Sequence, residues 1–459
     1  MTVNPDFSQV EVDQQVTNLT RYNIFFPEKR SFFLENTDLF GSYGINGFIN
    51  PFYSRTIGLD KNGNKIPIIA GARLSGNISK STRIGLMDMQ TGNKGDYYAD
   101  NYAAVSVNQS VLKRSMIKGY FLNRQSMEPD SLKQNDPLSK WGRNAGLEFD
   151  YSNLSGTWNA WGAFHQSIKS GIHSANQFVD FGFTYKTRHF SITQDLGSTG
   201  TNYYTDMGYV QRINNYDAVR DTSIRVGFKH LFNELGYNFF PTKGAAARIE
   251  FLMDNFIVFN PDNSFNEREH TLNFNLGFKN TSNIKAVVFA DEVHLLYPVS
   301  FTNGKPLPAA PYSYSQFTLS FASDTRKLFS YTISSGGGGF YNGTLKTISG
   351  GINLRSQPHL NIAIQAEYDK ISLPDPYGST ELFLISPKVE INFSTKVFWT
   401  TFLQYNTQQN NYNINSRFQY RYKPMSDLFL VYTDNYFTTP QLTNKNRAIV
   451  FKMNYWLNL

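Results

Sequence analysis

The last stretch of the chain, Arg447 to Leu459, limits most strongly what this sequence can fold into. Apolar side chains recur at every second position up to the carboxy-terminal residue: Ile449, Phe451, Met453, Tyr455, Leu457 and Leu459. Lys452, Asn454 and Asn458 lie between them, so an extended strand here has one apolar and one largely polar face. An apolar edge strand exposed to water promotes aggregation, and the pattern therefore favours a strand whose apolar face contacts lipid.

The same stretch resembles the C-terminal strand by which bacterial outer-membrane barrels are recognised for insertion. On that resemblance, we expect a location in the bacterial outer membrane, with lipid and the barrel-assembly machinery as partners. Other envelope proteins are possible further partners. The residues expected to carry the membrane-insertion signal are Phe451, Tyr455, Trp456, Leu457 and Leu459.

The composition agrees with strands as the membrane-spanning elements. Aromatic residues make up 16% of the 459 residues, yet the mean hydropathy is -0.40 and no run of about 18 apolar residues occurs. This combination is typical of a transmembrane β-barrel, in which only alternate residues face lipid and aromatic girdles mark both interfaces. The cysteine count of 0 excludes disulfides, thiolate metal ligands and cysteine nucleophiles.

The charge and the amino terminus bear on partners and export. The net charge is +7, but Lys and Arg are scattered singly, so we expect no nucleic-acid partner. The start at Met1 lacks the basic and apolar regions of a signal peptide. Because an outer-membrane protein must be exported, we expect this numbering to begin inside a longer precursor.

Alternating segments recur through most of the chain, for example at 179–185, 272–278, 360–368 and 412–422. A soluble β-sandwich and a porin-like barrel share this alternation, so periodicity alone does not distinguish them.

The connections do distinguish them. Short turns such as 77–81 and 111–115 alternate with longer polar connections such as 124–142 and 198–221, as in outer-membrane barrels. We predict an all-β, transmembrane antiparallel up-and-down β-barrel over residues 45–459, of about 22 strands with a range of about 18–24.

Residues 1–44 do not alternate cleanly and mix charges with aromatic residues and proline, which argues against a membrane strand. We predict a plug-like or lumen-lining segment; the alternative is a short periplasmic extension left from a domain junction. Its charged residues match no calcium-loop spacing, which favours ordinary salt bridges over a metal site. The candidate plug or lumen residues are Asp6, Glu11, Asp13, Glu28, Lys29, Arg30 and Glu35.

Two runs in this region, N-P-D-F-S-Q-V-E-V-D from Asn4 and F-F-P-E-K-R-S-F-F-L-E-N from Phe25, resemble a known junction segment. It belongs to a Bacteroidota outer-membrane β-barrel family of uncharacterised function, whose longer members carry an N-terminal carbohydrate-binding domain similar to family nine modules. The rest of the chain resembles that family mainly in strand rhythm and in the closing N-Y-W-L-N-L. The resemblance implies the barrel, and we do not carry the glycan-binding role of the longer members over to residues 1–459.

The polar faces of the predicted strands carry charges of both signs. Such charges on opposite walls could sort polar solutes in a transverse field, or they could simply hydrate the wall and pair with each other. The candidate lumen-wall residues are Asp180, Lys186, Arg225, Lys279, Glu367, Asp369, Arg417, Arg421 and Lys452.

Signatures of catalysis are weak. Ser110 to Lys113 fits S-x-x-K but falls at a predicted turn without a supporting motif. The 7 histidines, His230 among them, form no metal-binding doublet, and the run Gly336 to Gly339 opens no helix that would bind phosphate. We therefore expect no enzyme, no cofactor and no metal.

These observations favour a channel or gated passage for polar solutes, with the N-terminal segment partly occupying the lumen. One alternative is a plugged barrel that acts as a membrane anchor or as a subunit of an envelope complex. Another is a barrel enzyme acting on glycan or lipid at the outer surface, which requires Ser, His and an acidic residue at one rim.

Overall fold

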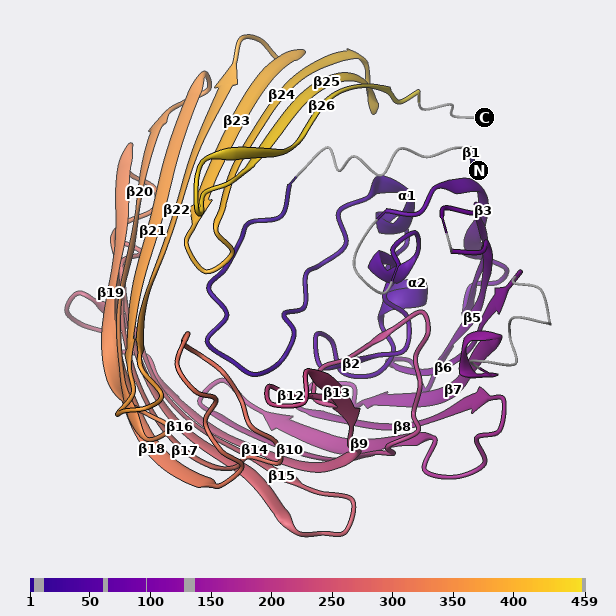
Figure 1. Ribbon diagram of the computed structural model, residues 1–459, viewed down its shortest axis with the longest axis horizontal. Coiled ribbons are helices and arrows are strands. Elements are labelled where there is room, and N and C mark those ends of the chain that lie inside the picture. The colour runs from indigo at the N-terminus through magenta and orange to yellow at the C-terminus, as the bar shows by residue number, and fades with distance from the viewer. Residues whose placement is uncertain (4–11, 61–64, 96, 128–136, 456–459) are drawn as a thin grey trace.

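The computed structural model describes residues 1–3, 12–60, 65–95, 97–127 and 137–455 (Figure 1). Almost all regular structure in these residues is β-strand, with only the short helices α1 (Ser31–Leu34) and α2 (Asp38–Gly41) and two 3-10 turns, Ser54–Thr56 and Pro137–Ser139. Among the described residues, no helix has the length and apolar character needed to cross a membrane.

One antiparallel sheet of 22 strands forms a curved wall around an interior, which confirms the predicted architecture (Figure 1). Each long strand pairs with the next long strand along the chain, and β10 pairs with β14 because the short strands between them leave the wall. The long strands are β3 (Ile68–Asn77), β4 (Thr82–Thr91), β5 (Asp100–Val111), β6 (Ser115–Ser126), β7 (Trp141–Ser152), β8 (Trp158–Lys169), β9 (Gln177–Lys186), β10 (Phe190–Thr199), β14 (Phe228–Phe239), β15 (Ala246–Phe259), β16 (Phe265–Phe278), β17 (Asn283–His294), β18 (Pro311–Ala322), β19 (Phe329–Phe340), β20 (Gly343–Ser356), β21 (Leu360–Ser372), β22 (Ser379–Asn392), β23 (Val397–Asn406), β24 (Asn411–Lys423), β25 (Ser426–Phe437) and β26 (Thr443–Met453).

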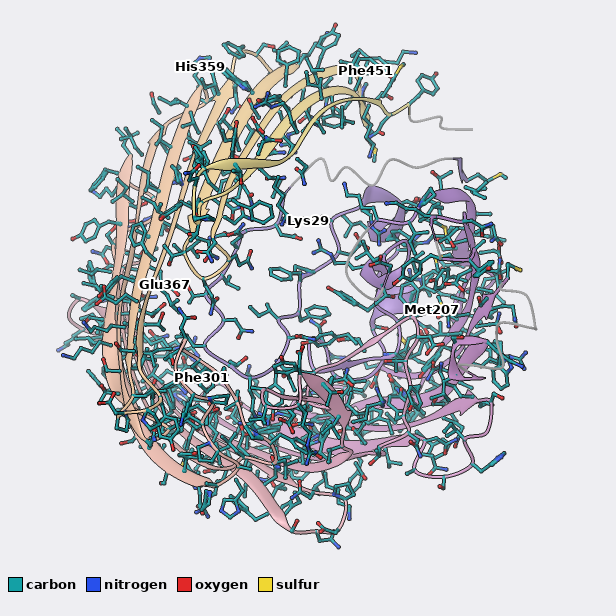
Figure 2. All side chains as sticks on the ribbon, viewed as in Figure 1. Lys29, Met207, Phe301, His359, Glu367 and Phe451 are labelled. Atoms are coloured by element: carbon teal, nitrogen blue, oxygen red, sulfur yellow. The ribbon has the colours of Figure 1, made fainter. Side chains whose placement is uncertain are left out.

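The two faces of the wall differ as the alternation predicts. Apolar side chains on one parity are exposed on the outer face, with Phe181 at 54%, Phe317 at 46% and Phe451 at 65% of their possible area. Figure 2 shows Phe451 outside the wall and Lys29 inside it. An outward face this apolar fits contact with hydrocarbon, because water would penalise so many exposed aromatic and aliphatic groups.

The wall has a seam between its first and last long strands. Without β1 (Thr2–Val3), 21 of the 22 strands remain, so β3 and β26 run in the same direction and could pair only in parallel. β1 pairs antiparallel with β3 through Thr2↔Gly71 and Val3↔Ala70, which places an oppositely directed strand beside the seam. Within the described residues, no register joins β26 to β1 or β3, so the wall is not closed there.

Residues 12–60 and 65–67, called the inner segment below, run inside the curve of the wall (Figure 1). The first long strand begins at Ile68. A second inner element follows β10: β11 (Tyr209–Val210) pairs with β2 (Ile49–Asn50), and β12 (Asn214–Asp217) forms a hairpin with β13 (Thr222–Arg225). The inner segment thus contacts both the wall and a loop that folds inward.

A hydrophobic core fixes the inner segment against β3 to β6. Leu39, Phe40 and Tyr43 are buried there. They pack against inward-facing wall residues that include Met87, Met89, Tyr102 and Leu122. These strands are apolar on both faces because one face meets the inner segment, which explains why their alternation is weaker than that of β16 or β21.

The orientation of the two faces predicts the effect of a charge placed on β18. Phe317→Arg puts a guanidinium on the outer face near the middle of the strand and should destabilise the barrel in lipid vesicles by about 2–4 kcal/mol. Urea unfolding followed by tryptophan fluorescence measures this change. In the matched control, Ser320→Arg on the inner face borders a cavity and should cost clearly less; equal costs for the two variants would contradict the assigned orientation.

Candidate functional site

The interior between the inner segment and the wall is the candidate functional site, and a cluster around Glu267 connects the two. Glu267 on β16 is buried and accepts two hydrogen bonds from Arg212, both at 2.9 Å. Arg21 of the inner segment donates to the same carboxylate. The ring centroid of Tyr22 lies 4.6 Å from the guanidinium carbon of each arginine, a cation–π distance to both.

This Glu267 cluster joins three parts of the chain: the inner segment, the inward loop after β10 and the wall. Burial alone would lower the pKa of Arg212, but the charge of Glu267 raises that pKa above its ordinary value. Both guanidiniums therefore stay charged, and removal of the carboxylate would leave two buried cations without a counter-charge.

A second cluster, around Glu148 on β7, binds the inner segment at Ser42 to Gly44, which is called the tip of the inner segment below. The Glu148 carboxylate accepts hydrogen bonds from the backbone N–H of Gly44 at 2.7 Å and from His165 Nε2 at 2.9 Å. Lys118 Nζ lies 2.5 Å from the other Glu148 oxygen and also donates to the carbonyl of Ser42 at 3.0 Å. Backbone groups of the inner segment are thus bound directly by a buried ion pair of the wall.

A third set of ion pairs braces the inner segment internally. Glu28 accepts hydrogen bonds from the Arg30 side chain at 2.7 and 3.0 Å and from Ser54 at 2.5 Å. Burial alone would raise the pKa of Glu28, but these hydrogen bonds with the Arg30 charge hold it below its ordinary value of 4.5. Arg55 pairs with Asp13, so the start and end of the inner segment are tied together.

Two glutamine side chains, on β23 and just after it, form hydrogen bonds with the backbone of the inner segment. Gln404 accepts from the N–H of Gln15 at 2.6 Å and donates to the carbonyl of Asp13 at 3.0 Å. Gln408 makes the same reciprocal pair with the backbone of Asn18, with both bonds at 2.9 Å. The extended backbone here has its polar groups paired without joining a sheet.

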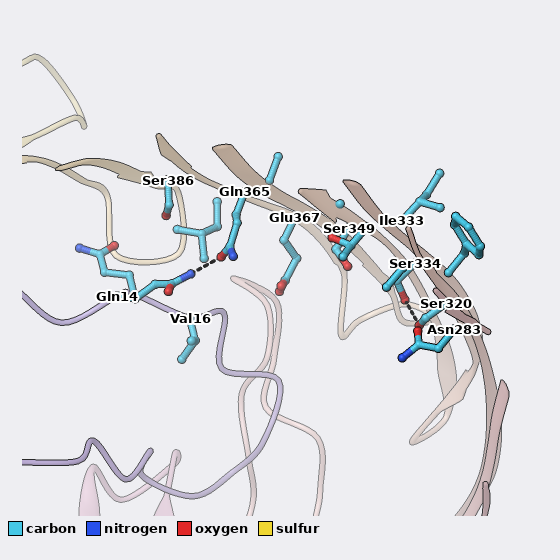
Figure 3. Close-up of a pocket in the computed structure, with 17 residues that line it drawn as sticks. Gln14, Val16, Asn283, Ser320, Ile333, Ser334, Ser349, Gln365, Glu367 and Ser386 are labelled. Carbon is cyan, nitrogen blue, oxygen red and sulfur yellow. Dashed lines mark hydrogen bonds between the residues drawn. The ribbon is translucent and has the colours of Figure 1, made fainter. Parts of the chain in front are cut away.

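A polar cavity of about 330 Å³ lies between this strip of the inner segment and the wall of β17 to β22 (Figure 3). Gln14 and Gln365 approach each other across it and are hydrogen-bonded. The polar groups along its wall are Asn283, Ser320, Ser334, Ser349, Gln365, Glu367 and Ser386. Hydroxyls and amides can donate and accept, so the cavity suits a polar solute and has one carboxylate.

A smaller cavity of about 160 Å³, which Gln14 also borders, is lined by basic side chains, and Lys388 there pairs with Glu390 at 2.6 Å. Lys29, Lys388 and Arg417 line it together with neutral side chains. Two neighbouring cavities between the inner segment and the wall therefore differ in the charged side chains that line them, Glu367 in the larger and Lys29, Lys388 and Arg417 in the smaller.

The predicted plug residues lie in several places. Asp13, Glu28, Lys29 and Arg30 form the contacts described above, and Lys29 also donates to the carbonyl of Val12 at 2.8 Å. Glu35 is exposed directly after α1. Asp6 and Glu11 lie outside the described residues, as do Trp456, Leu457 and Leu459 of the predicted insertion signal, whereas Phe451 and Tyr455 are exposed on β26 and just after it.

The predicted lumen-wall residues also lie at several different places in the structure. Glu367 borders the larger cavity and Arg417 the smaller one, while Asp369 accepts a hydrogen bond from Thr347 at 2.7 Å. Arg421 pairs with Asp427 at 3.0 Å.

The remaining wall residues are placed as follows. Lys452 has the inward parity of β26, and Asp180 faces inward on β9. Lys186 and Lys279 are exposed, at the end of β9 and in the turn after β16. Arg225 lies on the inward hairpin strand β13, not on a long wall strand, and donates to the carbonyl of Tyr203 at 2.9 Å.

Sequence reasoning missed Glu267, Arg212 and Lys118, although Glu267 occupies the polar parity of β16. The available signal was that parity, which β16 shows clearly where Leu272 alternates with Asn273. No pattern in a single strand indicates which inner residue lies opposite.

Comparisons with known proteins give a family and a distant structural likeness. A family model described as a domain of unknown function, DUF5916, matches residues 1–372. No curated protein matches the sequence. The fold is similar to the siderophore receptor PirA from Acinetobacter baumannii, with 10% identity, 87% of this chain and 78% of that chain covered, and a TM-score of 0.45. A likeness at this level supports no argument about function.

The Glu267 cluster predicts how firmly the inner segment is held. Glu267→Gln leaves two buried guanidiniums without a counter-charge and should weaken the attachment of residues 12–30 by about 3–5 kcal/mol. Hydrogen-exchange mass spectrometry of the folded barrel should show lost protection in that segment. The control is Glu292→Gln, which removes an exposed pair with Arg268 and should change protection by no more than about 1 kcal/mol; unchanged protection in Glu267→Gln would refute the attachment.

Proposed function

The chain belongs to the DUF5916 family, which has no assigned function, and we propose that it forms an outer-membrane β-barrel for the passage of polar solutes. In this proposal the inner segment partly occupies the lumen and restricts the route. Solutes are selected by shape, hydrogen bonding and charge, and no covalent chemistry takes place.

The observation that carries the proposal is the contrast between the two sides of one wall. Toward the interior, β17 to β22 present serine, asparagine, glutamine and glutamate side chains around a cavity of about 330 Å³. Toward the exterior, the same strands present Phe317, Leu319, Ile333 and Ile348, each more than 40% exposed. A wall that is polar inside and apolar outside is what a water-filled passage through lipid requires.

Aromatic side chains at the ends of the strands support the membrane location. On the outer face, Trp158, Tyr185 and Phe190 gather beside the turn between β9 and β10, with ring centroids 4.9 Å and 6.4 Å apart. Tyr331 lies 5.7 Å from Phe321 and 6.0 Å from Phe329 beside the turn between β18 and β19. Both groups lie at short turns, as expected for part of an aromatic girdle at one interface.

The two interior compartments suggest how passage is controlled. A solute moving past Gln14 leaves the cavity that contains Glu367 and enters the one lined by Lys29, Lys388 and Arg417. The inner segment forms one side of both cavities through Gln14, so its displacement would widen the route. Because the Glu267 and Glu148 clusters oppose that displacement, we propose a gated passage rather than an open pore.

The same clusters favour one rival function. A barrel whose inner segment is held permanently by buried ion pairs would serve as a membrane anchor or as a subunit of an envelope complex. The two functions differ in whether the inner segment can be displaced from the lumen.

Conductance in a planar lipid bilayer tests the proposal. The full-length barrel should carry a steady ion current, and Glu267→Gln should raise its open fraction by about tenfold or more, since about 1.4 kcal/mol of lost attachment already corresponds to a factor of ten. Glu292→Gln, whose exposed pair lies on the outer face, should conduct like the unchanged protein. Silence from the unchanged protein and from Glu267→Gln, with both shown to be folded by heat-modifiable migration, would favour the anchor.

A further inference from the structure

Three inward-facing side chains from adjacent strands converge at the wall beside the tip of the inner segment. Asp180 on β9, Asp195 on β10 and His230 on β14 each offer a ligand atom, and these atoms all lie within 4.8 Å of one another. His230 Nε2 is 3.5 Å from an oxygen of Asp180 and 3.9 Å from an oxygen of Asp195. The three residues are 50 positions apart at most, yet only the strand pairing brings them together.

The register explains why they converge. Gly197 of β10 pairs with Asp180 on one side and with His230 on the other, so these three residues form one row across three strands. Because Gly197 has no side chain, Asp180 and His230 can lean toward each other over its backbone. A Cβ at Gly197 would lie 2.0 Å from Cε1 of His230, so any other residue there would push the imidazole out of place.

The polar atoms of this group are buried and largely unsatisfied. His230 and Asp180 are each only 3% exposed. Within the described part of the chain, neither ring nitrogen of His230 has a hydrogen-bond partner, and neither has one oxygen of Asp180 or one of Asp195. Buried polar atoms normally find partners, so unsatisfied atoms on three side chains whose ligand atoms lie within 4.8 Å of one another indicate a missing ligand.

The surroundings orient the group as the outer shell of a metal site does. Trp161 Nε1–H donates to the second oxygen of Asp180 at 2.9 Å, which fixes that carboxylate. The Trp161 ring can lie there because Gly182, its partner in the register, has no Cβ to block it. Phe48 of the inner segment stands edge-on to His230 at 5.6 Å and covers the imidazole.

The local charge favours a cation. Asp180 and Asp195 border a cavity of about 350 Å³ that reaches Gly44 to Asn46 of the inner segment. Two further carboxylates, Glu148 and Asp150, also line it, against the single ammonium of Lys118. Lys118 is already paired with both of these carboxylates, at 2.5 and 3.0 Å. The two remaining aspartates therefore match the charge of one divalent ion bound with a neutral imidazole.

We propose that Asp180, Asp195 and His230 bind a divalent transition-metal ion of the Zn²⁺ type. Such ions take imidazole nitrogen and carboxylate oxygen at about 2.0–2.2 Å, so two ligand atoms of one ion lie at most about 4.4 Å apart, close to the separations seen here. Three protein ligands leave at least one coordination position facing the cavity. This assignment departs from the expectation of no metal, and it does not rest on solute passage.

The test is metal binding by the full-length barrel in detergent after treatment with a chelator. Titration with Zn²⁺ by calorimetry should show one saturable site per chain, and Co²⁺ should give visible d–d absorption bands with nitrogen and oxygen ligation. His230→Gln and Asp195→Asn should each abolish that site and the Co²⁺ bands. Trp161→Phe removes only the orienting hydrogen bond and should weaken affinity about 10–100-fold.

The matched control is His359→Gln, because His359 lies in the exposed turn before β21 and should leave binding unchanged. Trp161→Phe keeps the test valid if either ligand variant fails to fold, since it retains all three ligands. The proposal is overturned if the unchanged protein shows no saturable site. It is also overturned if His230→Gln folds and binds Zn²⁺ as tightly as the unchanged protein. If His230→Gln does not fold, Trp161→Phe decides instead, and undiminished Zn²⁺ binding by Trp161→Phe overturns the proposal.

Discussion

The structure depends on one constraint: a sheet that meets hydrocarbon must pair its backbone groups with neighbouring strands and turn its apolar parity outward. The long strands of this chain satisfy both conditions, since each pairs antiparallel with the next and exposes residues such as Phe317 and Phe451 on one face only. The residues that alternate with them along each strand must therefore face the interior. The wall side chains that contact the inner segment, such as Gln404 and Glu267, face inward for that reason.

Once the interior is polar, the inner segment can be held there by buried charge. An isolated charge in this space would be costly, so each carboxylate that meets the inner segment is matched with cations or hydrogen-bond donors, as at Glu267 and Glu148. Such pairs add less net stability than their number suggests, because desolvation offsets much of the attraction. Their stronger effect is on position, since only one placement of Arg21 and Gly44 satisfies both carboxylates.

Sequence patterns predicted the parts of the structure that repeat along a single strand. The alternation at 272–278 and 360–368 correctly gave strands of an antiparallel barrel wall, and the 21 long strands between Ile68 and Met453 fall within the predicted range of about 18–24. The patterns could not give contacts that depend on register: Asp180 was a candidate wall residue, but Gly197 between it and His230 became informative only with the pairing known. Arg225 lies on an inward hairpin because residues 200–227 leave the wall. The antiparallel pairing of β1 with β3 beside the seam likewise becomes visible only in the structure.

The central claim is that the apolar parity of the wall faces lipid, and spin-label accessibility along β21 tests it most directly. The chain has 0 cysteines, so single cysteines introduced from Leu360 to Ser372 carry the only labels. In lipid vesicles, dissolved oxygen should relax labels at Leu360, Ile362 and Ile364 most, whereas a water-soluble nickel chelate should reach Asn361, Gln365 and Glu367. A period of two with this phase supports the account. Labels at Ile362 and Ile364 that neither reagent reaches would place the apolar face in a dry protein core and contradict it.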